Sequence, residues 1–578
     1  MSQPLGSFCL VLHGHIPYVL GHSTWPHGSQ MLYDAVADSH MTVLQAVENL
    51  GYEGIQAQIA IGITPVMMEQ LADDRFKEWF THYLQVKRHD AEANEAEFRG
   101  RGDLHLAYLA ERWRGHYDHL LDKFRNTYDY DLLGAFRWHQ DVGNIEVITS
   151  AATHGYLPLL HEDGSIQAQL MQGVAVYERY MGRRPRGCWL PECAYRPACR
   201  WAPPPHIAGT QTPYPRKGIE EFLGENGIDY FIVDTHMLGG GDPLPVRVED
   251  TETLGKRWGR IRRIGETVHW LKTPRRPYFV GTRFEDHPPV VALVRDDETS
   301  LKVWSGEHGY PGDFEYLEFH KKHIPGDLRY WCVSDERNDL ASKRHYSPEN
   351  AAQRVQEHAG NFLFIVKTTL QHAPRDGHHP QPVVVSPFDA ELFGHWWHEG
   401  PWWLEKALRW MHQDPDIDVS TPSKYLAQHT PTEAVSLPEG SWGAGGKHWV
   451  WLNSEVDWTW KRIYEAEQEM QGLVRAHGAG HDPAAAAAIQ QAARELLLLQ
   501  ASDWQFLMTT RSAPDYAGSR IHCHYSDFRR CAALARRYCA GETIEQWEWD
   551  ELGHIQGRDR LFPDIDPLWF RDIRRPAL

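Results

Sequence analysis

Phe8-Cys9-Leu10-Val11-Leu12-His13-Gly14-His15 is a short apolar run that ends in two histidines separated by a glycine. A run of this kind predicts a buried strand that presents polar side chains at its carboxyl end. Residues 34–49 predict a helix, and residues 55–61 predict the next strand. Strand–helix–strand order favours a core built on a parallel sheet. We therefore expect an α/β protein whose functional side chains lie at the ends of parallel strands.

A second stretch, Gly187-Cys188-Trp189-Leu190-Pro191-Glu192-Cys193-Ala194-Tyr195, resembles the end of another buried strand. It places a carboxylate among apolar and aromatic residues, which costs free energy unless that group has partners or a task. Asp389 ends a third such run, residues 383–389, and aromatic residues follow it. In a parallel barrel the carboxyl ends of the strands surround one site. We expect that site to gather His13, His15, His154, Glu192 and Asp389.

Two carboxylates from different strands suit the chemistry of glycosidic bonds. One attacks the anomeric carbon while the other protonates the departing oxygen, and a retaining mechanism needs them about 5–5.5 Å apart. Taken singly, a buried carboxylate is more often a structural ion-pair partner than a catalyst. The combination of Glu192, Asp389 and the histidine clusters favours catalysis, and these two carboxylates are the candidate catalytic pair.

The His13-Gly14-His15 motif has an alternative interpretation. Alternate residues of a strand point the same way, so the pair could bind a divalent metal, as in a metal-dependent polysaccharide deacetylase. Such a site also needs an acidic ligand, and the motif has none in its immediate vicinity. We expect no metal and no cofactor; the histidines would hydrogen-bond sugar hydroxyls or orient the nucleophile.

The amino-acid composition indicates which class of molecule the protein binds. The net charge of -19 argues against a general nucleic-acid binder, which needs a basic surface. The chain has 24 Trp and 24 Tyr, whose flat faces suit the C–H faces of sugar rings. Residues 440–451 combine four glycines with three tryptophans, which predicts a stacking platform, although a loop packed on a helical region would use the same residues.

The remaining features concern compartment and domain organisation. No Cys-x-x-Cys pair, secretory leader or membrane-spanning apolar run is recognisable, so we expect a cytoplasmic protein without membrane contact. We expect a barrel in two parts, residues 1–75 and 135–414, interrupted by an inserted helical subdomain at 76–134. The second part would contain a long irregular loop at 237–290. Residues 415–578 would form a C-terminal helical domain that contributes to the substrate cleft.

Together these stretches are similar to five regions of glycoside hydrolase family 57. His13-Gly14-His15-Ile16-Pro17-Tyr18 resembles the first region and the stretch around His154 the second. Residues 189–195 resemble the nucleophile region, residues 389–397 the acid/base region and residues 501–506 the fifth region. Five regions in the same order over nearly the whole chain form a specific signal.

The resemblance implies a (β/α)7 barrel with an inserted helical domain and a C-terminal helical domain. It implies Glu192 as nucleophile and Asp389 as general acid/base, and no cofactor. It also implies contacts to α-1,4-glucan from other residues, namely His13, His15, His154, Trp304, Trp442, Trp451 and Asp503.

One region departs from the family pattern. Family members that build α-1,6 branches carry a loop with a tyrosine near its tip, thought to favour transfer over hydrolysis. The corresponding region here, 237–290, is longer and more basic, and Tyr278 is the nearest candidate for that tyrosine. We expect a monomeric retaining transglycosylase that forms α-1,6 branches. The alternatives are a 4-α-glucanotransferase or α-amylase on the same scaffold, and a non-catalytic glucan-binding protein.

Overall fold

The computed structural model describes residues 3–244, 246–249, 260–263, 272–281, 288–305, 308–335, 339–375 and 381–573. Its centre is a closed barrel of parallel strands, which follow one another around the barrel in the order β13-β1-β2-β3-β4-β7-β12. Arg295 closes the ring by a parallel bridge to Val385. The expected (β/α)7 barrel is therefore confirmed. The seven strands are β1 (Gly6–Gly14), β2 (Ile59–Ile63), β3 (Ile145–Ser150), β4 (Gly187–Trp189), β7 (Tyr230–Val233), β12 (Val290–Val294) and β13 (Val383–Asp389).

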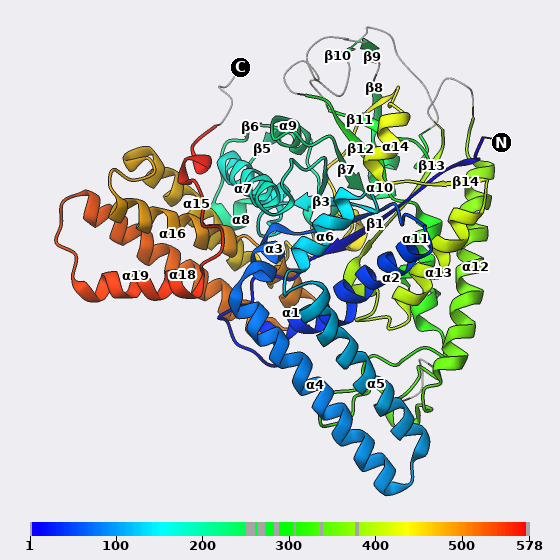
Figure 1. Ribbon diagram of the computed structural model, residues 1–578. Coiled ribbons are helices and arrows are strands. Elements are labelled where there is room, and N and C mark those ends of the chain that lie inside the picture. Colours follow the sequence, from blue (N-terminus) through cyan, green and yellow to red (C-terminus); the bar gives the residue numbers. More distant parts are fainter. Residues whose placement is uncertain are drawn as a thin grey trace.

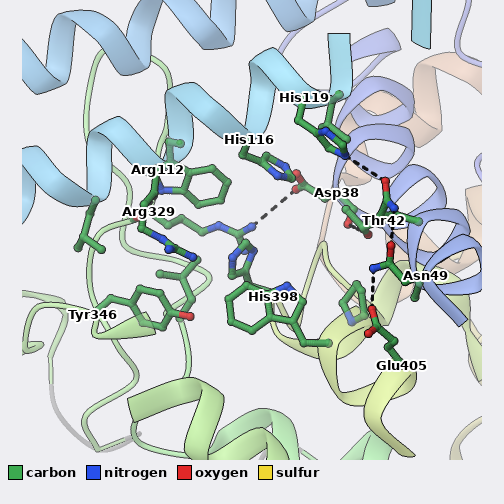
Figure 2. Close-up of a pocket in the computed structure, with 18 residues that line it drawn as sticks. Asp38, Thr42, Asn49, Arg112, His116, His119, Arg329, Tyr346, His398 and Glu405 are labelled. Carbon is green, nitrogen blue, oxygen red and sulfur yellow. Dashed lines mark hydrogen bonds and ion pairs between the residues drawn. The ribbon is translucent and has the colours of Figure 1, made fainter. Parts of the chain in front are cut away.

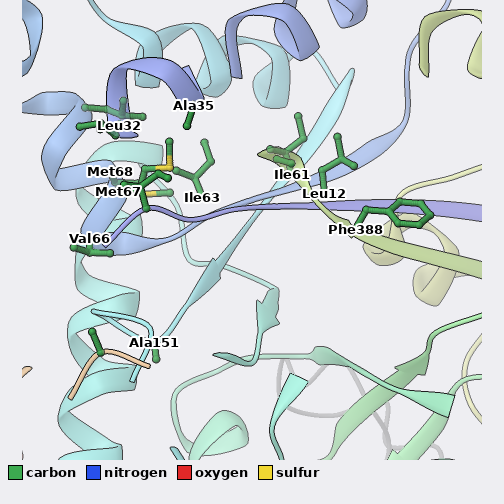
Figure 3. Close-up of a cluster of buried hydrophobic side chains, with 14 of the residues drawn as sticks. Leu12, Leu32, Ala35, Ile61, Ile63, Val66, Met67, Met68, Ala151 and Phe388 are labelled. Carbon is green, nitrogen blue, oxygen red and sulfur yellow. The ribbon is translucent and has the colours of Figure 1, made fainter. Parts of the chain in front are cut away.

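Burial on both faces explains why these strands are continuous apolar runs rather than alternating ones. Every residue of β1, β2 and β12 is buried. Figure 3 shows Ile63 of β2 beside Met67 and Met68 of a covering helix, and Leu12 of β1 on the side of Phe388 of β13. That helix is α3 (Pro65–Ala72), and α1 (Ser29–Ala35) is a second covering helix.

Other helices surround the barrel (Figure 1). The helix expected at 34–49 is present as the end of α1, a π-helical turn at Val36–His40, and α2 (Met41–Tyr52). The further helices of the barrel region include α6 (Leu132–Asp141), α7 (Asp163–Met181), α9 (Ile219–Glu225), α11 (Asp297–Trp304), α12 (Pro348–His372), α13 (Gly400–Gln413) and α14 (Pro422–Gln428).

Two long helices, α4 (Asp74–Arg101) and α5 (Leu104–Asp122), project from the barrel as a hairpin (Figure 1). Gly102 ends α4 in the left-handed conformation, with φ of 81°, which a glycine adopts without the steric cost of a Cβ. Trp113 and Tyr117 of α5 are buried, as the helical spacing of apolar residues predicts. The segment expected to be an inserted subdomain therefore lies mainly in this hairpin.

The structure differs from expectation between residues 237 and 290, where the described residues are not irregular. They form the antiparallel pair β9 (Val246–Glu249) and β10 (Arg260–Arg263), and the short strands β8 (Asp242–Leu244) and β11 (Tyr278–Val280). Strands of three or four residues carry too little periodicity to be recognised in a sequence.

The strand at 383–389, β13, is the last strand of the barrel, but two short strands follow it in the wider sheet. β14 (Ile417–Val419) pairs with β1, and β15 (Ala434–Ser436) pairs with β11. The helices of the C-terminal region begin only after these strands. They are α15 (Asp457–His477), α16 (Pro483–Leu499), α17 (Asp503–Thr509), α18 (Pro514–Cys539) and α19 (Gln546–Arg558). Among the described residues, no helix combines the length and apolar character needed to cross a bilayer.

A buried ion cluster joins the C-terminal helices to the loop after β1. Asp559 is fully buried and accepts hydrogen bonds from His22 Nε2 at 2.5 Å and from Arg558 Nε at 2.9 Å. Burial lowers the pKa of His22 to about 4, so His22 is a neutral donor at pH 7. Arg558 therefore lies between two carboxylates, those of Asp559 and Asp527, and His22 adds a neutral hydrogen bond to Asp559.

Asp559→Ala is expected to lower the unfolding temperature, because it leaves the buried His22 Nε2–H without its acceptor and Arg558 with Asp527 as its remaining partner. A buried donor left without its acceptor costs about 1–3 kcal/mol. Differential scanning calorimetry measures the effect. Asp550→Ala, which removes an exposed carboxylate from α19, is the control and should change stability by less than about 0.5 kcal/mol. Equal unfolding temperatures of the two variants would show that the cluster contributes nothing to the stability of the fold.

Candidate active site

The nucleophile candidate lies directly after the shortest strand of the barrel. β4 ends at Trp189, and a single 3-10 turn, Pro191–Cys193, follows. Glu192 and Cys193 both have positive φ, of 60° and 47°. Non-glycine residues adopt this conformation at a cost of about 1–3 kcal/mol and tend to cluster at functional sites. The backbone therefore holds Glu192 at the carboxyl end of the barrel.

Each oxygen of the Glu192 carboxylate accepts one strong hydrogen bond. Trp442 Nε1 donates to Oε2 at 2.9 Å, and Ser502 Oγ donates to Oε1 at 2.9 Å. Burial raises the pKa of Glu192 to about 7, while these two hydrogen bonds favour the ionised form and limit the rise. The side chain keeps 12% of its surface exposed, so a substrate can reach it.

The loop that carries Trp442 is attached to the nucleophile turn by the backbone. Tyr195 and Gly440 exchange two backbone hydrogen bonds, of 2.9 and 3.0 Å, and Trp442 N donates to Glu192 O at 3.1 Å. Trp442 is therefore held by two hydrogen bonds to Glu192, one from its backbone N–H and one from its ring N–H. This is the physical role of the glycine-rich stretch: it allows a loop to lie against the turn at residues 190–195.

Two histidines form a chain of hydrogen bonds that ends at the same carboxylate. His13 stacks on Trp189, with ring centroids 4.6 Å apart, and its Nε2 lies 3.1 Å from His154 Nε2. His154 Nδ1 lies 3.0 Å from Ser502 Oγ. Burial, followed by the charge of His15, holds the pKa of both rings well below the usual range, so both are neutral.

The direction of this chain follows from the donors available. Since Ser502 gives its proton to Glu192, we assign His154 Nδ1–H as the donor to Ser502 and His13 Nε2–H as the donor to His154. The assignment leaves His13 Nδ1 as an unprotonated nitrogen, and that atom is buried with no hydrogen-bond partner among the described residues. Each hydrogen bond from His13 through His154 and Ser502 is then donated in the direction of Glu192. This orientation stabilises the ionised form of the Glu192 carboxylate.

His15 belongs to a separate, charged cluster. Its Nε2 lies 3.0 Å from Asp503 Oδ2, and its Nδ1 lies 3.0 Å from Thr64 Oγ1. Burial disfavours the charged imidazolium, but Asp503 outweighs that effect and the pKa of His15 is raised. The His15 N–H also donates to Glu391 Oε1 at 3.0 Å. His15 therefore supplies positive charge beside two carboxylates.

Asp389 lies beside His13 at the end of the neighbouring strand, as the β1–β13 register shows. Its carboxylate accepts no hydrogen bond from the part of the chain that the structure describes. Burial raises the pKa of Asp389 well above its usual value, and the nearby charges of Glu391 and Glu192 raise it further. Arg295 acts in the opposite direction but is paired with Asp234 at 3.0 Å. The environment of Asp389 thus favours the protonated form.

The tryptophans expected to stack on a glucan differ in their accessibility. Trp304 and Trp442 are both half-buried, and their rings meet edge to face at 5.9 Å. They form one aromatic corner beside Glu192. Trp451 is only 1% exposed and stacks on Tyr156 at 4.6 Å, so it supports the loop from beneath. The expectation of direct stacking by Trp451 is therefore wrong, because nearness in sequence does not decide which ring faces solvent.

Tyr278 does not lie at the tip of a loop either. It belongs to β11, is fully buried, and its hydroxyl donates to Thr273 O at 2.8 Å. A side chain in this position cannot contact a substrate, so the expectation for Tyr278 is corrected. The residues between 245 and 271 that could carry a loop-tip group fall partly outside the described residues.

Sequence reasoning missed several members of the site. Ser502 lies in a recognised stretch, but a serine in a sequence does not reveal that its hydroxyl will meet Glu192. Glu391 follows Asp389 by two residues, and this spacing was a usable signal. Arg295 and Thr64 lie directly after strands, in stretches whose sequence shows no motif that would identify them as site residues. Trp449, 59% exposed in the glycine-rich stretch, is a further candidate for sugar contact.

A separate pocket of about 230 Å³ is lined by residues of α2, α5 and α13 (Figure 2). Asp38, His116, Arg329 and His398 converge around it in Figure 2. Asp38 Oδ2 lies 3.0 Å from His395 Nδ1, and Arg329 Nη1 donates to His395 O at 2.9 Å. These contacts fix the segment that carries the acid/base candidate.

The metal alternative can be examined on the same geometry. Donor atoms of His15, His154 and Asp503 lie within 4.8 Å of one another, a spacing that could hold a metal ion. However, both nitrogens of His154 already take part in the chain of hydrogen bonds to His13 and Ser502. Metal binding would therefore require the chain that leads to Glu192 to break.

Comparisons with known proteins agree with this geometry. The sequence profile of glycosyl hydrolase family 57 matches residues 9–438. The chain belongs to this family. A second profile, that of the 1,4-alpha-glucan branching enzyme C-terminal domain, matches residues 462–570. The family match spans the barrel, and the second match spans the helices that supply Ser502 and Asp503.

Individual relatives cover almost the whole chain. A 1,4-alpha-glucan branching enzyme of Thermococcus kodakarensis is 38% identical over 97% of this chain and 78% of its own length. The crystal structure of a branching enzyme of the same family from Pyrococcus horikoshii superposes with a TM-score of 0.86 at 38% identity, covering 99% of this chain and 98% of that one. The α-amylase AmyC of Thermotoga maritima has a TM-score of 0.78 at 26% identity, covering 99% and 100%.

Trp442→Phe is expected to shift the acidic limb of the kcat/KM profile of this family member to higher pH. The variant keeps a ring but removes the hydrogen bond that lowers the Glu192 pKa, now about 7. A candidate nucleophile has to be ionised to attack, so a higher pKa of Glu192 would leave less active enzyme at pH 6–7. Initial rates measured between pH 5 and 9 test this. Trp547→Phe, which changes an exposed ring on α19, is the control, and an unmoved acidic limb in Trp442→Phe would contradict the role of the indole N–H.

Proposed function

We propose that this chain is a 1,4-α-glucan branching enzyme that works by a retaining double displacement. The observation that carries the mechanism is the contrast between two carboxylates at one end of the barrel. Glu192 accepts two hydrogen bonds that favour its ionised form, whereas Asp389 accepts none from the described residues and lies beside other carboxylates. Opposed environments of this kind separate a nucleophile from an acid. The names of the relatives that span nearly the whole chain support the choice of reaction.

The first half of the reaction breaks the α-1,4 bond. Glu192 attacks the anomeric carbon from one face while Asp389 donates its proton to the departing 4-oxygen. The product is a glucosyl ester on Glu192 and a shortened glucan that leaves. His15 and Asp503 are placed to hydrogen-bond hydroxyls of the bound ring, and the corner of Trp304 and Trp442 offers apolar faces to it.

The second half forms the branch. Asp389, now ionised, takes the proton of a 6-hydroxyl on another glucan unit, and that oxygen attacks the anomeric carbon of the ester. The configuration is retained and an α-1,6 linkage results. Water competes for the same intermediate, so the balance of transfer and hydrolysis depends on how well the site excludes it.

The proposal extends to the setting of the reaction. A branching activity belongs to the synthesis of glycogen-like polysaccharide from soluble precursors, and we place it in the cytoplasm with the enzyme acting as a monomer. The absence of clustered cysteine pairs in the sequence supports a reducing compartment.

Incubation with amylose followed by proton NMR tests the activity directly. A branching enzyme creates α-1,6 anomeric signals while the number of reducing ends stays nearly constant. A 4-α-glucanotransferase would redistribute α-1,4 chains without new α-1,6 signals, and an α-amylase, the activity named for the Thermotoga maritima relative, would release reducing ends. A metal-dependent deacetylase would lose activity on treatment with EDTA. Any of these three results would refute the proposal.

A further inference from the structure

A large open pocket lies at the end of the barrel opposite the catalytic groups. It has a volume of about 790 Å³ and lies beside the residues that precede β2 and β3, next to the end of α2 and the start of α6. Glu192 and Asp389 lie at the carboxyl ends of the strands. Since a strand of five or six residues spans about 17–20 Å, the pocket is separate from the active site. The same few sugar units cannot occupy both.

Two exposed aromatic rings line this pocket. Tyr52, the last residue of α2, is 80% exposed, and Trp138 of α6 is 58% exposed. The Trp138 indole packs edge to face against His139 at 4.7 Å, so its orientation is constrained while its face remains accessible. Large exposed aromatic faces are unfavourable in water, and where they gather around a concavity they mark a binding site. Flat rings of this kind suit the C–H faces of sugars.

The polar lining determines which ligand the pocket accepts. It includes the carboxylates of Glu48, Asp129 and Asp131, and the amides of Gln56 and Asn144. The Glu48 carboxylate pairs with Lys123, and Asp131 accepts from Gly134 N at 2.9 Å. Asp129, exposed and with φ of 48°, accepts no hydrogen bond from the described part of the chain. Acidic groups repel phosphates and nucleic acids, whereas carboxylates and amides bind neutral hydroxyls well.

We propose that this pocket is a second, non-catalytic binding site for α-glucan, in which Trp138 and Tyr52 stack on glucosyl units and Asp129 accepts hydrogen bonds from their hydroxyls. The choice of ligand rests on the proposed function, because α-glucan is the neutral polymer that the enzyme would meet. A chain held here keeps the polysaccharide attached while its branches exchange at the active site. Attachment raises the effective concentration of glucan without a new catalytic contact.

The experiment compares four proteins: wild type, Trp138→Ala, Tyr52→Ala and a control, Trp79→Ala. Trp79 lies on α4, is 55% exposed and packs edge to face against His82 at 5.9 Å, so it matches Trp138 in setting but lies outside the pocket. Retardation in native gels containing amylopectin gives the apparent Kd. We expect the two pocket variants to bind about 5- to 10-fold more weakly, as the loss of one aromatic contact implies, and the control to match wild type.

Kinetics add a second readout that a damaged fold would not reproduce. In the two pocket variants KM for amylose should rise while kcat, and both constants for maltoheptaose, stay at wild-type values. Unchanged retardation in both variants, or an equal loss in Trp79→Ala, would overturn the second site. If α-1,6 linkages fail to form but Trp138→Ala still weakens binding, the proposed activity is wrong and the glucan site stands.

Discussion

Glu192→Gln is expected to lower kcat on amylose by at least about 10⁴-fold, the largest effect of any single substitution in this chain. An amide cannot attack the anomeric carbon, yet it has nearly the shape of the carboxylate and can still bond to Trp442 and Ser502. Binding of amylopectin should therefore survive, with Kd within about 3-fold of wild type. Quantitative NMR of α-1,6 linkages and native-gel retardation measure the two quantities.

Trapping the intermediate gives a direct test of the same prediction. A 5-fluoro maltosyl donor should leave a covalent adduct on a peptide that contains Glu192 in wild type, detectable by mass spectrometry, and no adduct in Glu192→Gln. Glu439→Gln is the matched control, since Glu439 pairs with His448 at 3.0 Å on the same loop region but makes no contact with Glu192. Labelling of any other residue would remove Glu192 from its proposed role.

Asp389→Asn is expected to have the second-largest effect, a fall of about 10²–10⁴-fold in kcat on amylose. The asparagine cannot donate a proton to the departing oxygen. A donor with a good leaving group, maltosyl fluoride, needs no such proton, so the first step on that donor should proceed at nearly the wild-type rate. Single-turnover release of fluoride measures this step.

The pH profile gives Asp389 a second signature. Burial and the charges of Glu391 and Glu192 raise the pKa of Asp389, so its acid form persists to higher pH and sets the alkaline limb of kcat/KM. That limb should disappear in Asp389→Asn. Asp297→Asn, which changes an exposed carboxylate at the start of α11, is the control. An equal loss of rate on amylose and on maltosyl fluoride would show that Asp389 is not the acid.

The apolar runs identified the parallel core correctly because parallel strands buried on both faces carry a signal of their own, whereas the closed barrel was implied by the family resemblance. Residues 8–15 and 383–389 are apolar runs that end in polar groups, and the same pattern follows from the geometry of any such barrel. The three-residue strands β8, β11, β14 and β15 carry no comparable signal, and their places in the sheet come from long-range pairing. Short length explains why these four strands were missed, whereas β4, which is also three residues long, was recognised from the apolar and aromatic residues around Glu192.

The same distinction applies to the site. Glu192, Asp389, His13 and His154 were predicted because each polar group follows an apolar strand, where its presence is costly without a function. Ser502 was not assigned a role, since nothing in a sequence tells that a hydroxyl more than three hundred residues away will donate to Glu192. Trp451 and Tyr278 were assigned wrongly for the converse reason: their sequence neighbours suggested a role that their burial excludes.

By itself, then, the sequence determined the class of the fold, the two carboxylates and the kind of chemistry, because these follow from local composition and from the order of strands. The tertiary structure decided how those carboxylates differ. Which of them is held ionised depends on hydrogen bonds from Trp442 and Ser502, and which favours the proton depends on the packing of Glu391 and Arg295 around Asp389. Such contacts join residues that are distant in the chain, and burial and charge act through space rather than along the sequence.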